Sequence, residues 1–245
     1  MRKSEAMPST ASPPPPCVLA VVGLQAEARI AQDPRVKTVC GGGQAALLKA
    51  RLAEALAAGG VAGLASFGIA GGLDAGLRPG TAVLARWVAG AGGRWTADAA
   101  WLAALTARCP GMVAAGIVGS DHAIGTPQAR QGLQASTGAA AVDMESHVVA
   151  EMAQAHGLPF VAIRVVADAA ERTLPAAALI PLRPDGRPDI GRILAAVAAD
   201  PGQIPALIRV ARETGKAFAS LRRVRRQLGL GLACPDLLKL VLDMP

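Results

Sequence analysis

Two acidic residues follow apolar segments at positions where an α/β protein carries its chemistry. Glu145 closes the run Val142-Asp143-Met144-Glu145 at the start of a predicted helix, and Asp168 comes just after a predicted strand. The carboxyl ends of parallel strands are where such folds bind ligands. A carboxylate that accepts hydrogen bonds from a diol, together with a carboxyl that donates a proton, suits cleavage of the bond between a ribose and a base.

Each carboxylate also has a structural interpretation that the sequence leaves open. A negative charge near a helix N-terminus is stabilised by the helix dipole, so Glu145 could serve the helix alone. Asp143 is interpreted as an N-cap, and Asp168 could cap the segment that follows it. Glu27, shortly after the first predicted strand, is either an exposed helix carboxylate or a site residue.

Two glycine-rich motifs, Gly41-Gly42-Gly43 and Gly68-Ile69-Ala70-Gly71-Gly72, each follow a predicted strand. Glycine lets backbone N–H groups approach an anion or a ribose closely, although a tight turn would need the same residues. Neither motif is a Walker loop or a dinucleotide fingerprint. His122 could line a pocket. The histidines lack the spacing of metal ligands, so no metal site is predicted.

Apolar strands alternate with helical segments along the chain. Strands are predicted at 18–22, 36–39, 61–67, 81–88, 112–118, 140–142 and 160–166, and helices at 45–58, 98–108 and 145–156. Several of the strands are uninterrupted by polar residues, which is typical of a buried, mainly parallel sheet with helices on both faces. After Ile190 the pattern becomes helical and basic.

The chain divides into three predicted parts. Residues 1–16 end in four prolines and are expected to form a disordered or polyproline leader. Residues 17–227 are expected to form one α/β domain. Residues 228–245 form an apolar C-terminal tail, preceded by a cluster of arginines at 222–226. The tail either packs on a neighbouring subunit or, with the arginines, makes a peripheral membrane contact.

Composition narrows the function classes. Aromatic residues make up 2% of the 245-residue chain, which argues against nucleic-acid binding through stacking platforms. The net charge of +7 reflects either an arginine-rich codon bias or an anionic partner. The cysteines form no CxxC pair, the N-terminus lacks the apolar stretch of a signal peptide, and no run of about 18 apolar residues occurs. A cytoplasmic protein is expected, with the inner membrane as the one possible peripheral contact.

Taken together, these motifs resemble the nucleoside phosphorylase/nucleosidase superfamily, which includes purine nucleoside phosphorylases and methylthioadenosine/S-adenosylhomocysteine nucleosidases. The resemblance runs from Val18 to Leu221. It depends on the 68–72 motif with Leu77-Arg78-Pro79-Gly80, on 142–145, and on Arg164 through Asp168, in this order. It implies a three-layer αβα fold with a mixed, mainly parallel sheet.

Two further motifs are similar to the hopanoid-associated phosphorylases of that superfamily. They are Gly-Leu-x-x-Glu-Ala-Arg at 23–29 and Cys-Gly-Gly-Gly at 40–43. That family is implicated in removing adenine from adenosylhopane during hopanoid biosynthesis. The resemblance therefore implies a lipid-linked or other small nucleoside as the substrate, and a homo-oligomer.

The resemblance also implies residue roles. Asp168 would protonate N7 of the purine, Glu145 would bind the ribose 2′ and 3′ hydroxyls with Met144 packing against the sugar, and Glu27 would orient or activate a water. Further substrate contacts are implied at the glycine motif and at the edge of the base: Gly68, Ile69, Ala70, Gly71, Ala123 and Ile124.

The acceptor of the ribosyl group is either water or phosphate. A water or phosphate site is implied at Gly23, Arg29, Gly42 and Ser66. Phosphorylases usually carry an arginine and a serine around the second glycine motif, where this chain has Ser66 and Ile69. Their first-loop arginine motif is not clear here either, although Arg29 could substitute. Hydrolysis is therefore favoured, without a cofactor, and inorganic phosphate remains the alternative co-substrate.

Two other functions stay open. One is a soluble purine nucleoside phosphorylase or methylthioadenosine/S-adenosylhomocysteine nucleosidase of the same fold. The other is a non-catalytic binding protein that keeps the fold, against which the presence of both Glu145 and Asp168 counts.

Overall fold

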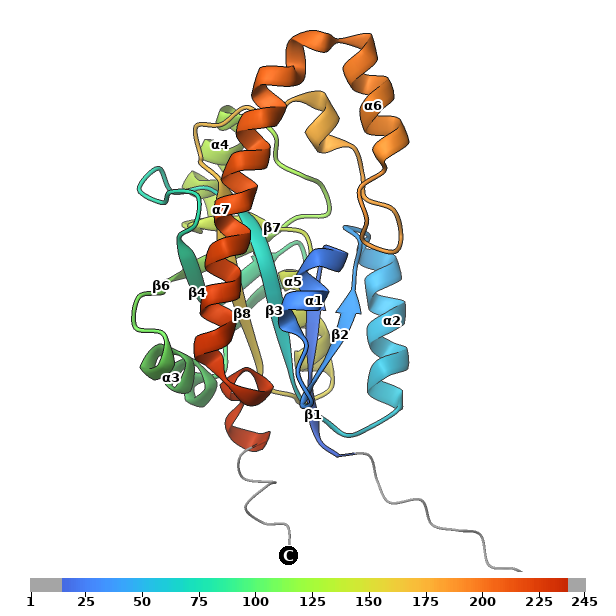
Figure 1. The fold of residues 1–245 in the computed structure, drawn as a ribbon. Helices are drawn as coiled ribbons and strands as arrows, with labels where there is room; N and C mark the ends of the chain where they lie inside the picture. The colour runs from blue at the N-terminus through green and yellow to red at the C-terminus, as the bar shows by residue number, and fades with distance from the viewer. Residues whose placement is uncertain (1–14, 238–245) are drawn as a thin grey trace, which may run out of the picture.

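A mixed sheet of eight strands forms the centre of the molecule in the computed structural model, which describes residues 15–237 (Figure 1). The strands are β1 (Cys17–Val22), β2 (Val36–Cys40), β3 (Val61–Gly72), β4 (Ala82–Gly90), β5 (Gly93–Thr96), β6 (Val113–Gly119), β7 (Ala141–Asp143) and β8 (Phe160–Asp168). The helices are α1 (Gln25–Ala31), α2 (Ala45–Ala57), α3 (Ala99–Arg108), α4 (Pro127–Thr137), α5 (Ser146–Ala155), α6 (Ile190–Ala199) and α7 (Ile204–Leu228). Short 3-10 turns are η1 (Ala176–Leu179), η2 (Pro201–Gln203) and η3 (Leu230–Ala233).

Most strand pairings are parallel, as predicted. The pairs β1–β2, β1–β3, β3–β8, β4–β6 and β6–β7 are parallel, whereas β3–β7, β4–β5 and β4–β8 are antiparallel. As a result β3, β8, β4, β6 and β7 pair in a closed ring. At one point of that ring Gly71 lies opposite Val142 on one side and Asp168 on the other. The three motifs singled out in the sequence therefore meet at one end of the sheet.

Helices cover both faces of the sheet, so the predicted three-layer architecture is confirmed (Figure 1). Side chains alternate along β1: Val18 and Ala20 face one way, toward α1, α3 and α7, whereas Leu19 and Val21 face α2 and α5. Two apolar cores result, one on each face. The long helix α7 crosses the first face, and its C-terminal half supplies Leu221 and other buried side chains.

The glycine motif lies inside a strand, which is a correction to the predicted end of β3 near residue 67. β3 continues to Gly72 because β8 pairs with it on one side and β7 on the other. Ladder hydrogen bonds from both neighbours outweigh the weak strand propensity of glycine. The helix α4 was not predicted, because its one buried residue is Arg130 and no apolar stripe marks it in the sequence.

The predicted separate tail is wrong for residues 228–237. Leu228, Leu232 and Leu237 are buried in the same core as α7, and Trp101 Nε1 donates a hydrogen bond of 2.8 Å to the Leu232 carbonyl. These apolar side chains therefore complete the core of their own chain and are not available to bind a neighbouring subunit or a membrane. Residues 238–245 of the predicted tail and 1–14 of the predicted leader lie outside the described residues.

Among residues 15–237 no single helix is long and apolar enough to cross a membrane. The helices Ile190–Ala199 and Pro201–Leu228 reach the length and apolar composition of a membrane span only when they are counted together, and the chain bends by 109° between them.

Leu232 and Leu230 provide a matched test of the C-terminal packing. Leu232 is fully buried, whereas Leu230 is 67% exposed. We expect Leu232→Ala to lower the free energy of unfolding by about 2–5 kcal/mol, because it removes buried methyl groups and leaves a cavity. Leu230→Ala should change it by less than about 0.5 kcal/mol. Urea unfolding of both variants measures the difference, and equally small effects would show that the segment does not belong to the core.

Candidate functional site

A cavity of about 690 Å³ opens where β1, β3 and β8 end. Eleven of the residues singled out in the sequence line it: Gly23, Glu27, Gly42, Ile69, Ala70, Gly71, Ala123, Ile124, Met144, Glu145 and Asp168. His122, considered as a pocket residue, lines it as well. The closed ring of strands thus brings together groups that are up to about 145 residues apart in sequence. Such a gathering of distant residues is expected of a site at the ends of strands.

A buried guanidinium organises one side of the cavity. Arg164, on β8, is 1% exposed. Its Nε lies 2.6 Å from Asp143 Oδ2, and its Nη2 donates to Glu145 Oε2 at 3.1 Å and to Ser66 Oγ at 2.6 Å. Burial alone would lower the pKa of Arg164, but the carboxylates of Asp143, Glu145 and Glu27 outweigh burial and raise it. Arg164 therefore stays charged and holds these acids on one wall.

Glu27 is buried, so its interpretation as an exposed helix carboxylate is wrong. Its Oε2 accepts hydrogen bonds from the N–H groups of Gly23 at 2.9 Å and Leu24 at 2.8 Å, and its Oε1 accepts from Ile69 N at 2.7 Å. A Cβ at position 68 would collide with this carboxylate, which is why glycine is needed there. Burial raises the pKa of Glu27, and Arg164 and the three N–H groups oppose that rise.

Glu145 occupies the N-cap position of α5, but its side chain makes no capping bond. Asp143 Oδ1 accepts from Ser146 N at 3.0 Å instead, so Asp143 bonds to the first residue of the helix although the N-cap position predicted for it belongs to Glu145. Glu145 turns toward Arg164 and the cavity, and a Cβ on Gly23 would come within 2.8 Å of its Oε1. Burial raises the pKa of Glu145 to about 7, assisted by Asp143 and Glu27 and opposed by Arg164.

Asp168 also lines the cavity and pairs with a second buried arginine. Arg130 Nη1 forms an ion pair with Asp168 Oδ2, and the same side chain donates to the carbonyls of Ile124 at 2.9 Å and Ala169 at 2.8 Å. Asp168 therefore does not cap a helix. Burial raises the pKa of Asp168, and Arg130 holds that rise back.

Three residues of the predicted site lie off the cavity wall. Arg29 is exposed on α1, and Ser66 is fully buried where its hydroxyl bonds to Arg164 and Ser146. Gly68 lies behind the Glu27 carboxylate. The two arginines that do line the cavity, Arg164 and Arg130, are already paired with carboxylates.

Sequence reasoning missed the roles of both arginines. Arg164 had a usable signal, because a charged residue inside an apolar strand is rarely buried unless it is paired. Arg130 had none, because α4 has no apolar periodicity to place its inner face.

The remaining wall is apolar. It combines Met144 and Ala123 with a segment that follows β8 and includes η1, whose lining residues are Leu174, Ala178, Leu179, Ile180, Pro181 and Leu182. The cavity thus has an acidic wall, an isolated buried acid and an apolar cap, which suits a ligand with a diol, a protonatable ring and an apolar substituent.

Comparisons with known proteins show the family of the chain and its fold. A family model of the phosphorylase superfamily matches residues 18–199. No curated protein matches the chain.

Among solved structures, similarity is high in fold and low in sequence. The 5′-methylthioadenosine/S-adenosylhomocysteine nucleosidase from Colwellia psychrerythraea, in complex with adenine, has a TM-score of 0.61 and 16% identity over 89% of this chain and 95% of that one. The nucleosidase from Neisseria meningitidis with methylthio-immucillin-A has a TM-score of 0.60 and 18% identity over 86% and 97%. Futalosine hydrolase of Helicobacter pylori has a TM-score of 0.58 and 13% identity over 87% and 98%.

The raised pKa of Glu145 predicts a pH-dependent stability. Its folded pKa of about 7 exceeds the ordinary 4.5, so folding is favoured while the group is protonated. That stability is full below about pH 4.5 and is lost as pH rises through about 7, in total about 3 kcal/mol. We expect Glu145→Gln to lose less free energy of unfolding than the wild type between about pH 5 and about pH 8.

Glu151→Gln is the control on the same helix, since Glu151 is a half-exposed partner of Lys49. Urea unfolding at both pH values measures the effect. An equal decline in the wild type and in Glu145→Gln would mean that Glu145 does not carry the pH dependence.

Proposed function

Because this chain belongs to the phosphorylase superfamily and is an enzyme of that group, we propose that it cleaves the N-glycosidic bond of an adenine nucleoside and releases adenine. The observation that carries the proposal is the arrangement of one cavity. Asp168, a largely buried acid with a raised pKa, pairs with Arg130, whereas the Glu27 and Glu145 carboxylates of the same cavity gather around Arg164. Breaking this bond leaves negative charge on the base and positive charge on the sugar. Asp168 can protonate the base, and the Glu27 and Glu145 carboxylates can stabilise the sugar.

The base lies toward Asp168. As the C1′–N9 bond breaks, the electron pair goes to the purine, and Asp168 delivers a proton to N7. General acid catalysis of this kind contributes about 10²–10⁴-fold. Asp168 must be protonated to act, and burial favours the neutral form. The backbone at Ala123 and Ile124, on the same cavity, contacts the edge of the base.

The ribose lies toward the acidic wall. Glu145 accepts hydrogen bonds from the 2′ and 3′ hydroxyls, with Met144 against the sugar. The positive charge that develops on the ribose is stabilised by the Glu145 and Glu27 carboxylates, because preorganised charge in a buried site is worth more than in water. Arg164, bonded to the outer side of Glu145, keeps that carboxylate in place.

Water is the proposed acceptor. Glu27 is held by three backbone N–H groups and faces the cavity, so it can orient a water and take its proton as the oxygen bonds to C1′. The products are adenine and a free ribosyl group. A phosphate dianion would need unpaired donors. The side chains expected to supply them lie elsewhere, since Arg29 is exposed outside the cavity and Ser66 is bonded to Arg164.

The proposed substrate carries a large apolar group on the ribose, with adenosylhopane as the specific candidate. The apolar cap around Leu174, Leu179 and Ile180 supports this choice. A methylthioadenosine/S-adenosylhomocysteine nucleosidase activity is the second candidate, favoured by the solved structures of similar fold.

One assay tests the proposal. The purified chain is incubated with adenosine, methylthioadenosine or adenosylhopane, with and without inorganic phosphate, and products are identified by mass spectrometry. We expect adenine and a free ribosyl product in phosphate-free buffer, fastest from adenosylhopane. Asp168→Asn, shown to be folded by circular dichroism, should release adenine at least about 100-fold more slowly.

The outcomes separate the alternatives. Strict phosphate dependence with a 1-phosphate product would replace hydrolysis by phosphorolysis. Fastest turnover of methylthioadenosine would select the second candidate. Absence of adenine from all three nucleosides, or full activity of Asp168→Asn, would contradict the function itself.

Arg130 predicts a change in the pH dependence of turnover. Its charge opposes protonation of Asp168. We therefore expect Arg130→Gln to raise the pKa of Asp168, so that the alkaline limb of the kcat profile moves to higher pH. Arg86→Gln, which changes an exposed arginine on β4, is the control and should leave the limb in place. A folded Arg130→Gln enzyme with an unmoved alkaline limb would remove Arg130 from the control of this proton.

A further inference from the structure

One part of the molecule has no core of its own. From Ile190 to Lys216, through α6, η2 and the first half of α7, no residue is buried. Figure 1 shows this helical hairpin (residues 190–216) projecting beyond the end of the sheet. The first buried side chain on α7 is Ala217, so only the C-terminal half of that helix packs on the sheet.

The hairpin is nevertheless apolar. Four of the seven large hydrophobic side chains exposed in residues 15–237 belong to it: Ile190 at 59%, Leu194 at 63%, Ile204 at 44% and Ile208 at 48%. The ten residues of α6 include one charge, Arg192. Clustered exposed apolar side chains, unlike single ones, mark a surface that binds something.

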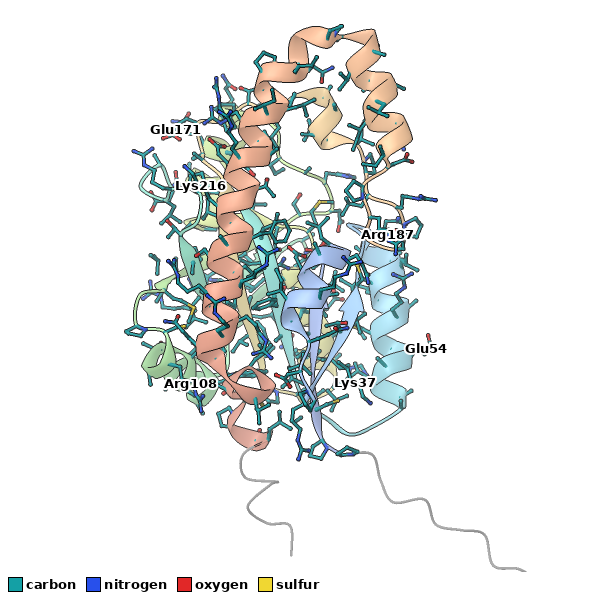
Figure 2. All side chains as sticks on the ribbon, viewed as in Figure 1. Lys37, Glu54, Arg108, Glu171, Arg187 and Lys216 are labelled. Carbon is teal, nitrogen blue, oxygen red and sulfur yellow. The ribbon has the colours of Figure 1, made fainter. Side chains whose placement is uncertain are left out.

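The charge around these side chains is net positive. Arg192, Arg209, Arg212 and Lys216 are exposed, and within residues 15–237 none of them forms an ion pair. Of the two acids of the hairpin, Glu213 pairs with Arg172, whereas Asp200 is exposed and accepts a hydrogen bond from the backbone N–H of Gly202. Four positive charges therefore stand against one carboxylate without an ion pair in the described residues. Figure 2 shows Lys216 on α7 and Arg187 before α6, on the two limbs below the tip.

The hairpin is joined to the cap of the cavity. α6 packs against η1. Gln203, in η2, accepts a hydrogen bond of 2.9 Å from Ala177 N through its side-chain oxygen. Leu179 of η1 lines the cavity and is 37% exposed. The hairpin is therefore in direct contact with the segment that forms the apolar cap of the cavity.

We propose that the hairpin of residues 190–216 docks on an anionic lipid bilayer, with Ile190, Leu194, Ile204 and Ile208 among the acyl chains and the arginines at the headgroups. Apolar burial and attraction to anionic lipids act together in such contacts. The docking follows from the surface of the hairpin. Its use, which is to let a nucleoside with a lipid substituent enter the cavity from the bilayer, rests on the proposed function.

A bilayer fits this surface better than a second copy of the chain. A stable dimer buries about 800 Å² per partner over a well-matched patch. The hairpin is a narrow projection whose exposed apolar side chains lie along its two helices among unpaired positive charges, and two such net-positive surfaces would repel each other. An anionic bilayer supplies the opposite charge and can adapt to the shape of the hairpin.

Co-sedimentation of the full-length chain with vesicles tests the docking. One set of vesicles contains equal parts of phosphatidylglycerol and phosphatidylethanolamine, and the other contains phosphatidylcholine alone. We expect binding to the anionic set, weakened when NaCl rises from about 0.05 M to about 0.5 M. The double variant Leu194→Gln/Ile208→Gln should bind at least about tenfold more weakly.

Two matched controls keep the result specific. Leu230→Gln changes a 67% exposed leucine at the other end of α7, about 37 Å away, and should bind like the wild type. Arg209→Gln/Arg212→Gln should weaken binding, whereas Arg222→Gln/Arg226→Gln, on the packed half of α7, should weaken it less.

Each contrary outcome is defined. Wild-type protein that stays in the supernatant with anionic vesicles at low salt overturns the docking. So does unchanged binding by Leu194→Gln/Ile208→Gln, or a dimer in sedimentation velocity that this variant converts to monomer without any vesicle binding. Adenine release from soluble adenosine is measured in parallel and should be equal in the wild type and the hairpin variants. A docking failure with adenine release intact leaves the proposed function standing, and the reverse result leaves the docking standing.

Discussion

The buried guanidinium of Arg164 is the constraint on which the acidic wall of the site depends. Three carboxylates lie within its influence, and each would be costly to bury without a positive partner. Arg164 can hold them because β8 places it between Ser66, in the middle of β3, and the turn that carries Asp143 and Glu145. The site is therefore built into the sheet itself rather than added on loops.

Charge is unevenly distributed over the cavity because the two buried arginines serve different numbers of acids. Arg164 faces Asp143, Glu145 and Glu27, so that wall keeps excess negative charge and Glu145 a pKa of about 7. Arg130 faces Asp168 alone. A ligand that becomes positive at one end and negative at the other during reaction matches this distribution, whereas a ligand of uniform charge does not.

Much of the site could be predicted from the sequence because its acids follow strands. Asp168 and Glu145 stand next to apolar segments whose period and length are readable, and Glu27 follows the first strand at a short distance. The continuation of β3 through Gly72 could not be predicted, because it depends on pairing with two strands that come later in the chain. Arg130 could not be placed because its burial follows from the closed ring and from no local pattern. The apolar residues at 228–237 were recognised but misassigned, since composition alone does not say which surface they cover.

The C-terminal part of the chain shows how one helix can serve two environments. The second half of α7 and the segment after it fill the core, with Leu221, Val224 and Leu228 against the sheet and Arg225 paired to Asp33. Because this half anchors the helix, the first half can leave the sheet without unfolding, although no residue of α6 or η2 is fully buried in the described chain. A projecting apolar hairpin is stable only if its helices are held from one end, and α7 holds it there. The hairpin also contacts η1, which belongs to the apolar cap, so the helix that fills the core and the cap of the cavity together hold the hairpin beside the site.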